Sequence, residues 1–307
     1  MIFNISKNIT FSKFYKKLNL VSLIFVILSL SLIFFKGLNF GVDFKGGTLI
    51  EIRTENKNSN ISDIRRSLIK MNLEDITVKR FGTEGDFLIK VKNNKTTNEN
   101  FIQNINETLI KDLGYDVNFR RVEKVGPKVS NELLKNGLLA ICLSLAAMLF
   151  YIWIRFEWQF SLAAIIALIH DVLITLGLFS ILSYEINLSI VAAVLTIVGY
   201  SMNDTVVIFD RIRENLKKYS KISIEEISNV STNETLSRTL ITSVTTLLAL
   251  FSIFIFGGAI LKGFSFAMIF GVIIGTYSSI FVATPLLGYT NVSQKTILKE
   301  DSEINNQ

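Results

Sequence analysis

The stretch IVGYSMNDTVVIFDRIREN, Ile197 to Asn215, begins as an apolar, membrane-spanning type of helix and ends as a charged, water-facing one. Asp204 lies within it, inside the long apolar run Ile186–Phe209, which holds no other charged side chain. A carboxylate at the centre of a hydrocarbon layer costs on the order of 2.5–3.5 kcal/mol. The environment of this one acid therefore bears on both the fold and the function.

The whole chain is unusually apolar. Its 307 residues are 50% hydrophobic and only 19% charged, with a mean hydropathy of +0.43, which is more apolar than a soluble domain of this size. The net charge of +6 is spread along the chain without a basic–aromatic array, so we interpret it as flanking membrane spans and expect no nucleic-acid partner. Cys142 and His170 are the only residues of their types, which excludes an intrachain disulfide and a multi-histidine metal site, and we expect no cofactor.

Six segments are long and apolar enough to cross a membrane, since a helical span takes roughly 20 apolar residues. The chain is therefore predicted to be an α-helical polytopic membrane protein with spans at Leu18–Phe35, Gly137–Ile154, Phe160–Leu182, Ile186–Phe209, Leu240–Ile260 and Phe264–Gly288. Bulky residues follow the first span where a signal peptidase would need small ones, so we interpret this span as an uncleaved signal anchor.

Basic residues predict the orientation. They collect in the N-terminal segment and between the fourth and fifth spans, whereas the third-to-fourth connection has none and the fifth-to-sixth only Lys262. Both termini are therefore expected in the cytoplasm, with the segment between the first two spans on the outer side of the membrane. The predicted order is a cytoplasmic N-terminus (1–17), the first span (18–35), an outer segment (36–136), spans 2–6 (137–288) with a cytoplasmic loop (210–237), and a cytoplasmic tail (289–307).

The segment between the first two spans alternates between strand-like and helix-like patterns. The strands are expected at Gly47–Thr54, Asp75–Phe81, Asp86–Lys92 and Val117–Val125, and the helices at Ile61–Met71 and Asn98–Leu113. This βαββαβ order is that of a ferredoxin-like α+β domain. About 80 residues bury only a small core, and they hold no catalytic triad, metal cluster or phosphate loop, so we expect no enzyme.

A glycine-rich stretch, GVDFKGGT, stands at the entrance of this domain at Gly41–Thr48. Glycine loops bind phosphate where they open a helix, but these glycines precede a strand. We therefore interpret Gly41 and Asp43 as parts of a tight structural connection in which Gly46 and Gly47 supply unusual backbone angles.

Asp204 has two interpretations. It lies about six residues, or roughly 9 Å of helix rise, from the cytoplasmic end of its span, so water could reach it there. The alternative is burial within a helix bundle. Burial is favoured by a polar stripe on the same helix, formed by Thr196, Tyr200, Ser201 and Asp204 with Asn203 alongside.

Further polar residues lie in the neighbouring spans. Arg238 begins the fifth span and is either a positive-inside anchor or the partner of Asp204, and a threonine face continues from it through Thr242, Thr245 and Thr246. Pairing would hold Asp204 ionised, and protonation would release Arg238. His170 and Asp171 lie mid-span and either satisfy one another or take part in proton movement.

The last span carries a ridge of small residues that permits close helix packing, at Ala267, Gly271, Gly275, Ser279 and Ala283. Because no nucleotide site is recognisable, we expect work to come from an ion gradient. One charge that moves through 100 mV yields about 2.3 kcal/mol. The residues therefore predict a proton- or cation-coupled membrane protein.

Four segments resemble motifs of the SecD/SecF family of bacterial protein-export subunits, on its SecF side. They are GVDFKGGT (41–48), VGPKVSNELLKNGLLAI (125–141), GYSMNDTVVIFDRIREN (199–215) and the last two spans (238–287). The family is similar to one half of the RND transporter superfamily. The resemblance implies a location in the bacterial inner membrane, with residues 36–136 in the periplasm. It also implies a SecD partner and an assembly with the SecYEG channel and YajC. It also implies that proton flow moves the periplasmic domains and so helps preproteins to cross, with Asp204 and Arg238 at the family's proton-pathway positions.

Two alternative functions stay open. A small-molecule RND exporter would share this topology, but such exporters carry much larger outer domains around a substrate tunnel. A passive scaffold subunit would need no ion coupling, and substitution of Asp204 would leave its function unchanged.

Overall fold

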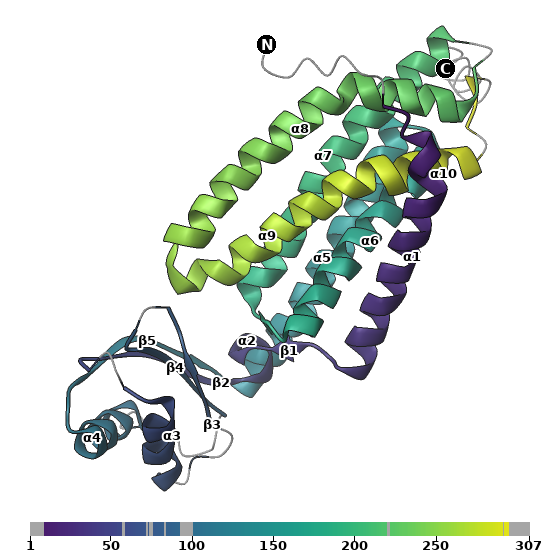
Figure 1. Cartoon of the computed structure of the whole chain (residues 1–307). Helices are drawn as coiled ribbons and strands as arrows, with labels where there is room; N and C mark the ends of the chain where they lie inside the picture. The colour runs from purple at the N-terminus through teal and green to yellow at the C-terminus, as the bar shows by residue number, and fades with distance from the viewer. Residues whose placement is uncertain are drawn as a thin grey trace. The chain divides into compact units, whose positions relative to one another are not determined.

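The computed structural model describes residues 9–56, 59–71, 73, 76–82, 84–92, 101–219, 222–290 and 292–294. The chain divides into two compact units (Figure 1). Phe40–Leu138 and Glu185–Leu188 form the sheet unit, and the rest of the described chain forms the helical unit.

The described residues contain six helical segments long and apolar enough to span a membrane, which confirms the predicted number. The first five are α1 (Ser12–Phe35), α5 (Pro127–Arg155), α6 (Trp158–Leu182), α7 (Leu188–Lys218) and α8 (Ile224–Phe256). The last span is built from α9 (Gly258–Ser278), a π-helical turn η1 (Ser279–Ala283) and α10 (Thr284–Tyr289).

The connection between the fourth and fifth spans differs from the loop expected at 210–237. Within the described residues α7 continues to Lys218 and α8 begins at Ile224, so most of this stretch is helical. Arg211 explains part of the extension, because its Nε lies 2.7 Å from a carboxylate oxygen of Glu234 and so joins α7 to α8. Ser223 caps the start of α8 by accepting a hydrogen bond from the Glu226 N–H.

Two of the predicted spans run a few residues past the ends of their helices. The fifth span stops at Phe256 rather than Ile260, because Gly258 adopts a φ of 74° and turns the chain into α9. The fourth span begins at Leu188, and Ile186 belongs instead to the two-residue strand β6 (Glu185–Ile186), which pairs with β1 (Asn39–Phe40).

Within the helical unit, α9 packs against α8 and α6, and α1 packs against α6 (Figure 1). Small residues set the closest approaches. A Cβ on Gly271 would lie 2.3 Å from the Ile197 side chain, and one on Gly275 would lie 2.8 Å from the Cβ of Ser201. Alanine at position 275 would force α9 away from α7, and alanine at position 271 would force the Ile197 side chain to move, so the ridge in the last span does bring two helices together.

The sheet unit has the predicted ferredoxin-like order. The elements are β2 (Gly47–Thr54), α3 (Ile61–Lys70), β3 (Ile76–Arg80), β4 (Asp86–Val91), α4 (Phe101–Leu113) and β5 (Val117–Val125). The strands form one sheet in the order β3-β4-β2-β5, and every neighbouring pair is antiparallel. Alternate strand residues meet the apolar stripes of α3 and α4 in a core that includes Ile50, Ile52, Ile64, Leu68, Phe87, Ile89, Ile105 and Leu109.

The glycine-rich entrance forms the short helix α2 (Val42–Lys45) and then leads into strand β2, which is not the geometry of a phosphate loop. Gly46 and Gly47 have φ values of 74° and 137°. A Cβ on Gly47 would lie 2.7 Å from the backbone oxygen of Val91, so the position requires glycine.

The same entrance contacts the segment before α7. Asp43 Oδ2 accepts a hydrogen bond of 2.9 Å from the N–H of Leu188, the first residue of that helix. The N–H of Gly41 donates to the Ile186 carbonyl at 2.8 Å. A Cβ on Gly41 would lie 2.5 Å from a carboxylate oxygen of Glu185, so that flexible side chain would have to move. Asp43 therefore acts as a helix cap supplied from a distant part of the sequence.

Candidate functional site

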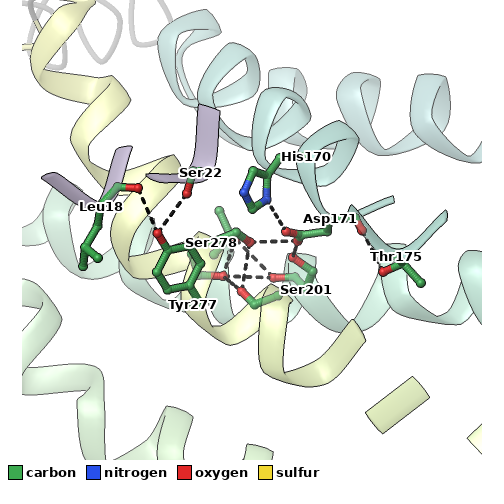
Figure 2. A network of polar contacts seen from close by, with 11 residues as sticks. Leu18, Ser22, His170, Asp171, Thr175, Ser201, Tyr277 and Ser278 are labelled. Atoms are coloured by element: carbon green, nitrogen blue, oxygen red, sulfur yellow. Dashed lines mark hydrogen bonds and ion pairs between the residues drawn. The ribbon is translucent and has the colours of Figure 1, made fainter. Parts of the chain in front are cut away.

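A network of polar side chains lies inside the apolar helical unit, centred on Asp171 of α6 (Figure 2). Asp171 is fully buried, and its two carboxylate oxygens accept three hydrogen bonds. Oδ1 lies 2.8 Å from His170 Nδ1. Oδ2 accepts from the hydroxyl of Ser201 on α7 at 2.6 Å and from that of Ser278 on α9 at 2.8 Å. One carboxylate thus joins three membrane-spanning helices by short hydrogen bonds.

The network continues to α1 through Tyr277. The Tyr277 ring lies against the His170 ring, with centroids 6.4 Å apart. Its hydroxyl donates to the Leu18 carbonyl at 3.0 Å and bonds the Ser22 hydroxyl at 2.9 Å (Figure 2). Because the single phenol proton goes to the carbonyl, Ser22 donates to Tyr277. The His170–Asp171 pair is therefore linked to four helices.

A second group of hydroxyls lies where α9 becomes the π-helical turn. Ser279 bonds the Thr205 hydroxyl of α7 at 2.8 Å and donates to the Gly275 carbonyl at 2.8 Å. The Thr284 hydroxyl donates to the Ser279 carbonyl, five residues back, at 2.7 Å, and so supports the wide turn. Single π-helical turns recur at functional sites, and this one directly follows Ser278, a ligand of Asp171.

Asp204 is also buried, with 2% of its surface exposed, but it is held far more loosely than Asp171. Its Oδ2 accepts from Ser243 of α8 at 3.5 Å and from Thr276 of α9 at 3.4 Å. Both distances are at the long limit for a hydrogen bond. The two hydroxyls bond each other more closely, at 2.7 Å. Asp204 is therefore a buried carboxylate with little local stabilisation of its charge.

The predicted polar stripe on α7 is only partly buried. Ser201 and Asp204 are buried and Tyr200 is half-buried, whereas Thr196 and Asn203 are exposed. The expectation that the whole stripe lies inside this bundle was wrong for Thr196. At 3.6 residues per turn, Thr196 is about 80° and Asn203 about 100° around the helix from Asp204, which is enough to leave the buried face.

Arg238 does not form the expected ion pair. Its side chain is exposed, and none of the ion pairs among the described residues joins it to Asp204. Ser243 occupies the level of Asp204 instead, and it lies five residues, or roughly 7.5 Å of helix rise, beyond Arg238. The threonine face that continues from Arg238 is half-buried at Thr242 and exposed at Thr245.

The arrangement suits proton exchange. It brings together two buried carboxylates, one imidazole and several hydroxyls, groups that accept, hold or pass a proton. Among the described residues there is no cluster of three or more metal-ligating side chains.

Sequence reasoning identified both acids but missed most of their partners. Ser243, Thr276, Ser278 and Tyr277 were not predicted as site residues, although Ser279 was noted in the small-residue ridge. The available signal was a hydroxyl at nearly every polar position of the last two spans. Serine and threonine are common in membrane helices, where they bond the backbone of the preceding turn, as Thr245 does with Ile241. Only the packing distinguishes those from the hydroxyls that face an acid.

Two family descriptions match the chain. The C-terminal region of the "Protein export membrane protein SecD/SecF" family matches residues 105–293. The SecD/SecF GG motif matches residues 31–57, which include the glycine-rich entrance.

Curated relatives are similar over most of their length. The chain is 46% identical over 252 residues to the protein translocase subunit SecF of Rickettsia bellii, which covers 81% of this chain and 82% of the relative. It is 44% identical over 267 residues to the SecF subunit of Cereibacter sphaeroides, which covers 84% of this chain and 82% of that one.

Solved structures show the same fold. The crystal structure of SecDF from Thermus thermophilus, described as a translocon-associated membrane protein, superposes with a TM-score of 0.86 at 33% identity. The match covers 95% of this chain and 40% of the SecDF chain. SecDF in a super-membrane-facing form gives a TM-score of 0.71 at 33% identity and covers 99% of this chain and 41% of that one. The chain therefore spans about two-fifths of the SecDF chains.

Proposed function

The chain belongs to the SecD/SecF family of protein export membrane proteins, and we propose that it is an ion-driven accessory subunit of the Sec protein-export translocase. It is a multi-pass membrane protein with six apolar spans. We place it in the bacterial inner membrane, with both termini in the cytoplasm and the sheet unit in the periplasm. On this proposal it acts on preproteins in transit and has no catalytic role of its own.

Asp204 carries the proposal. A buried carboxylate that accepts only two long hydrogen bonds is costly to keep ionised, and those bonds do little to fix its position. Such a group changes its contacts readily when a proton arrives or leaves. Because its two partners lie on α8 and α9, each change alters how these helices pack on α7. This is the kind of two-state element that an ion gradient can bias.

Arg238 supplies the opposite charge in this proposal. It lies exposed on α8, about one and a half turns from the level of Asp204. A rearrangement of α8 along α7 would bring the guanidinium toward the ionised carboxylate, and protonation would release it. Asn203, His170 and Asp171 are further candidates for the ion path.

The partners follow from the family. The related SecDF chains are more than twice as long as this one, and we propose that a SecD subunit supplies the missing part. Exposed polar side chains in apolar spans fit this arrangement, since Thr196, Asn203 and Arg238 would otherwise face lipid. The SecYEG channel and YajC would complete the assembly.

The two alternatives make different predictions. An RND-type exporter half would need a substrate tunnel, for which a sheet unit with a single four-stranded sheet offers little enclosure. A passive scaffold would need the fold but neither buried acid.

The test measures export of a signal-bearing preprotein by pulse-chase labelling, in cells whose own copy of this subunit is depleted. The wild-type chain should restore export, and Asp204→Asn should not. Asp210→Asn is the matched control, because Asp210 lies on the same helix in an exposed ion pair with Arg155. Wild-type export by the Asp204 variant at normal protein level would refute ion coupling and favour the scaffold. Normal export with new sensitivity to dyes or detergents would favour the exporter.

A further inference from the structure

His170 has one ring nitrogen whose role the site described above does not explain. The side chain is 5% exposed, and its Nδ1 faces Asp171 at 2.8 Å. Nε2 is buried, and no group among the described residues hydrogen-bonds it. Figure 2 shows this second nitrogen on the side of the ring turned away from Asp171. A buried, unpartnered ring nitrogen leaves one position of the imidazole open to a proton.

The hydrogen bonds around Asp171 determine which atom is free to take a proton. Two hydroxyls donate to Oδ2, and both favour the ionised carboxylate. An ionised carboxylate in turn requires a donor on Nδ1, so the neutral ring carries its proton there. The lone pair that remains is on Nε2.

Net charge gives the reason for a proton to bind. Neutral His170 beside ionised Asp171 leaves one negative charge in an apolar interior, and such a charge is costly unless a positive one accompanies it. None of the ion pairs among the described residues supplies a lysine or arginine to Asp171. A proton on His170 would make the pair neutral overall.

We propose that the His170–Asp171 pair is a second proton-binding site, separate from Asp204, which is loaded and unloaded at Nε2 of His170. On loading, the Nε2 lone pair forms one N–H bond, while the Nδ1 proton stays on its hydrogen bond to Asp171. On unloading, the same bond breaks and the proton leaves from Nε2. The use of this proton in driving export rests on the proposed function, whereas proton binding itself does not.

The groups that face the pair allow this cycle and transmit its state. From α7 and α9 the facing groups are the hydroxyls of Ser201 and Ser278, which carry no charge. The other titratable contact is the Tyr277 ring on α9, stacked on His170, and its hydroxyl reaches α1. Asp204 lies three residues beyond Ser201 on α7, and a negative charge there would favour loading. Loading therefore changes the charge at a junction of four helices.

The sequence offers a direct test, because His170 is the only histidine. The full chain, purified with a tag that contains no histidine, is labelled with ¹⁵N-histidine, reconstituted in lipid vesicles and studied by solid-state NMR. At the alkaline end we expect a proton on Nδ1 and none on Nε2. As the pH is lowered across about pH 9 to 5, Nε2 should become protonated in a single step.

Variants give the expected shifts. Asp171→Asn removes the negative partner, so the variant should need a lower pH than the wild-type chain to bind a proton at Nε2. Ser22→Ala is the control, since Ser22 contacts Tyr277 but neither member of the pair, and it should leave the midpoint in place. If Asp171→Asn does not fold, Ser278→Ala serves instead. It removes one hydrogen bond to Asp171 and should change the pH at which Nε2 binds its proton by less than Asp171→Asn would.

Two results would overturn the proposal. One is an Nε2 signal that does not change with pH across this range. The other is an Nε2 signal that does not respond to pH but changes when sodium chloride replaces another salt at fixed pH and ionic strength. That result would indicate a sodium site. Failure of the proposed function is seen separately, because Asp204→Asn is scored by export and should leave a His170 titration measurable.

Discussion

Gly275→Ala should weaken the contact between α7 and α9 that holds both buried acids in place. The substitution adds one methyl group on the face of α9 turned toward α7. There the new Cβ would lie 2.8 Å from the Cβ of Ser201 and 3.2 Å from its Cα. Ordinary carbon–carbon contacts lie at about 3.5–4.0 Å, so the two helices must separate by roughly 1 Å.

The magnitude follows from what that separation breaks. Ser201 donates to Asp171 at 2.6 Å, and Thr205 bonds Ser279 across the same interface at 2.8 Å. A shift of roughly 1 Å takes either bond beyond hydrogen-bonding distance. Overpacking costs about 1–3 kcal/mol, and each lost bond adds about 0.5–1.5 kcal/mol. These contributions add to about 2–6 kcal/mol, and local relaxation reduces the expected loss to about 2–4 kcal/mol.

The assay is thermal unfolding of the full chain in detergent, with Gly288→Ala as the matched control. Gly288 lies near the end of the same span, and a Cβ there would meet nothing within 4 Å. A double-mutant cycle isolates the contact. In a Ser201→Gly background the colliding Cβ is gone, so Gly275→Ala should cost much less than it does in the wild type. Equal melting temperatures for the two alanine variants, or equal costs in both backgrounds, would refute the packing explanation.

Three further predictions concern the sheet unit, and hydrogen exchange of the full chain, corrected for intrinsic rates, measures each. Lys70 and Ser67 hydrogen-bond Asp112 and lower the pKa of its carboxyl. These hydrogen bonds therefore stabilise the fold above the ordinary carboxylate pKa of about 3.9, and their contribution is lost as the pH falls through the lower pKa of the folded state. Asp112→Asn should remove that acid-dependent loss of stability, and an unchanged pH profile would contradict the prediction. Phe87→Ala empties a fully buried core position and should lower the unfolding free energy by about 3–5 kcal/mol. The protection factors of the sheet amides should then fall a hundredfold or more, and a fall of less than tenfold would contradict the prediction. Asp43→Ala removes the cap on the Leu188 N–H and should lower local stability by about 0.5–2 kcal/mol. The loss of amide protection should be confined to the first turn of α7, whereas an even loss across the chain would indicate general unfolding.

The sequence was sufficient for the fold because the relevant patterns are local. A run of apolar residues is enough to predict a span, and strand alternation around Ile50 and Ile52 is enough to predict which face of β2 is buried. Span ends were less predictable. Hydropathy stops where a helix leaves the apolar layer, whereas α7 and α8 continue into water through ion pairs such as Arg211 with Glu234.

The site was only half predictable, since its partners come from helices far apart in the chain. A charged residue in an apolar run is conspicuous, so Asp204 and Asp171 could be found without a structure. Their ligands are serines and threonines, which look alike whether they bond an acid or their own backbone. The pairing of Arg238 with Asp204 was a reasonable expectation from charge alone, but helix register decides it, and register places Ser243 beside the acid.

The positions of the two acids imply that they respond to one another. Ser201, a ligand of Asp171, lies one turn from Asp204 on α7, a rise of about 4.5 Å. On α9 the corresponding residues are Ser278 for Asp171 and Thr276 for Asp204, only two positions apart. Because the same two helices hold both carboxylates, a shift of α9 along α7 cannot release one without disturbing the other. The short bonds at Asp171 resist that shift and the long ones at Asp204 do not. On the proposed function, Asp171 is therefore the fixed point, and movement begins at the loosely held Asp204.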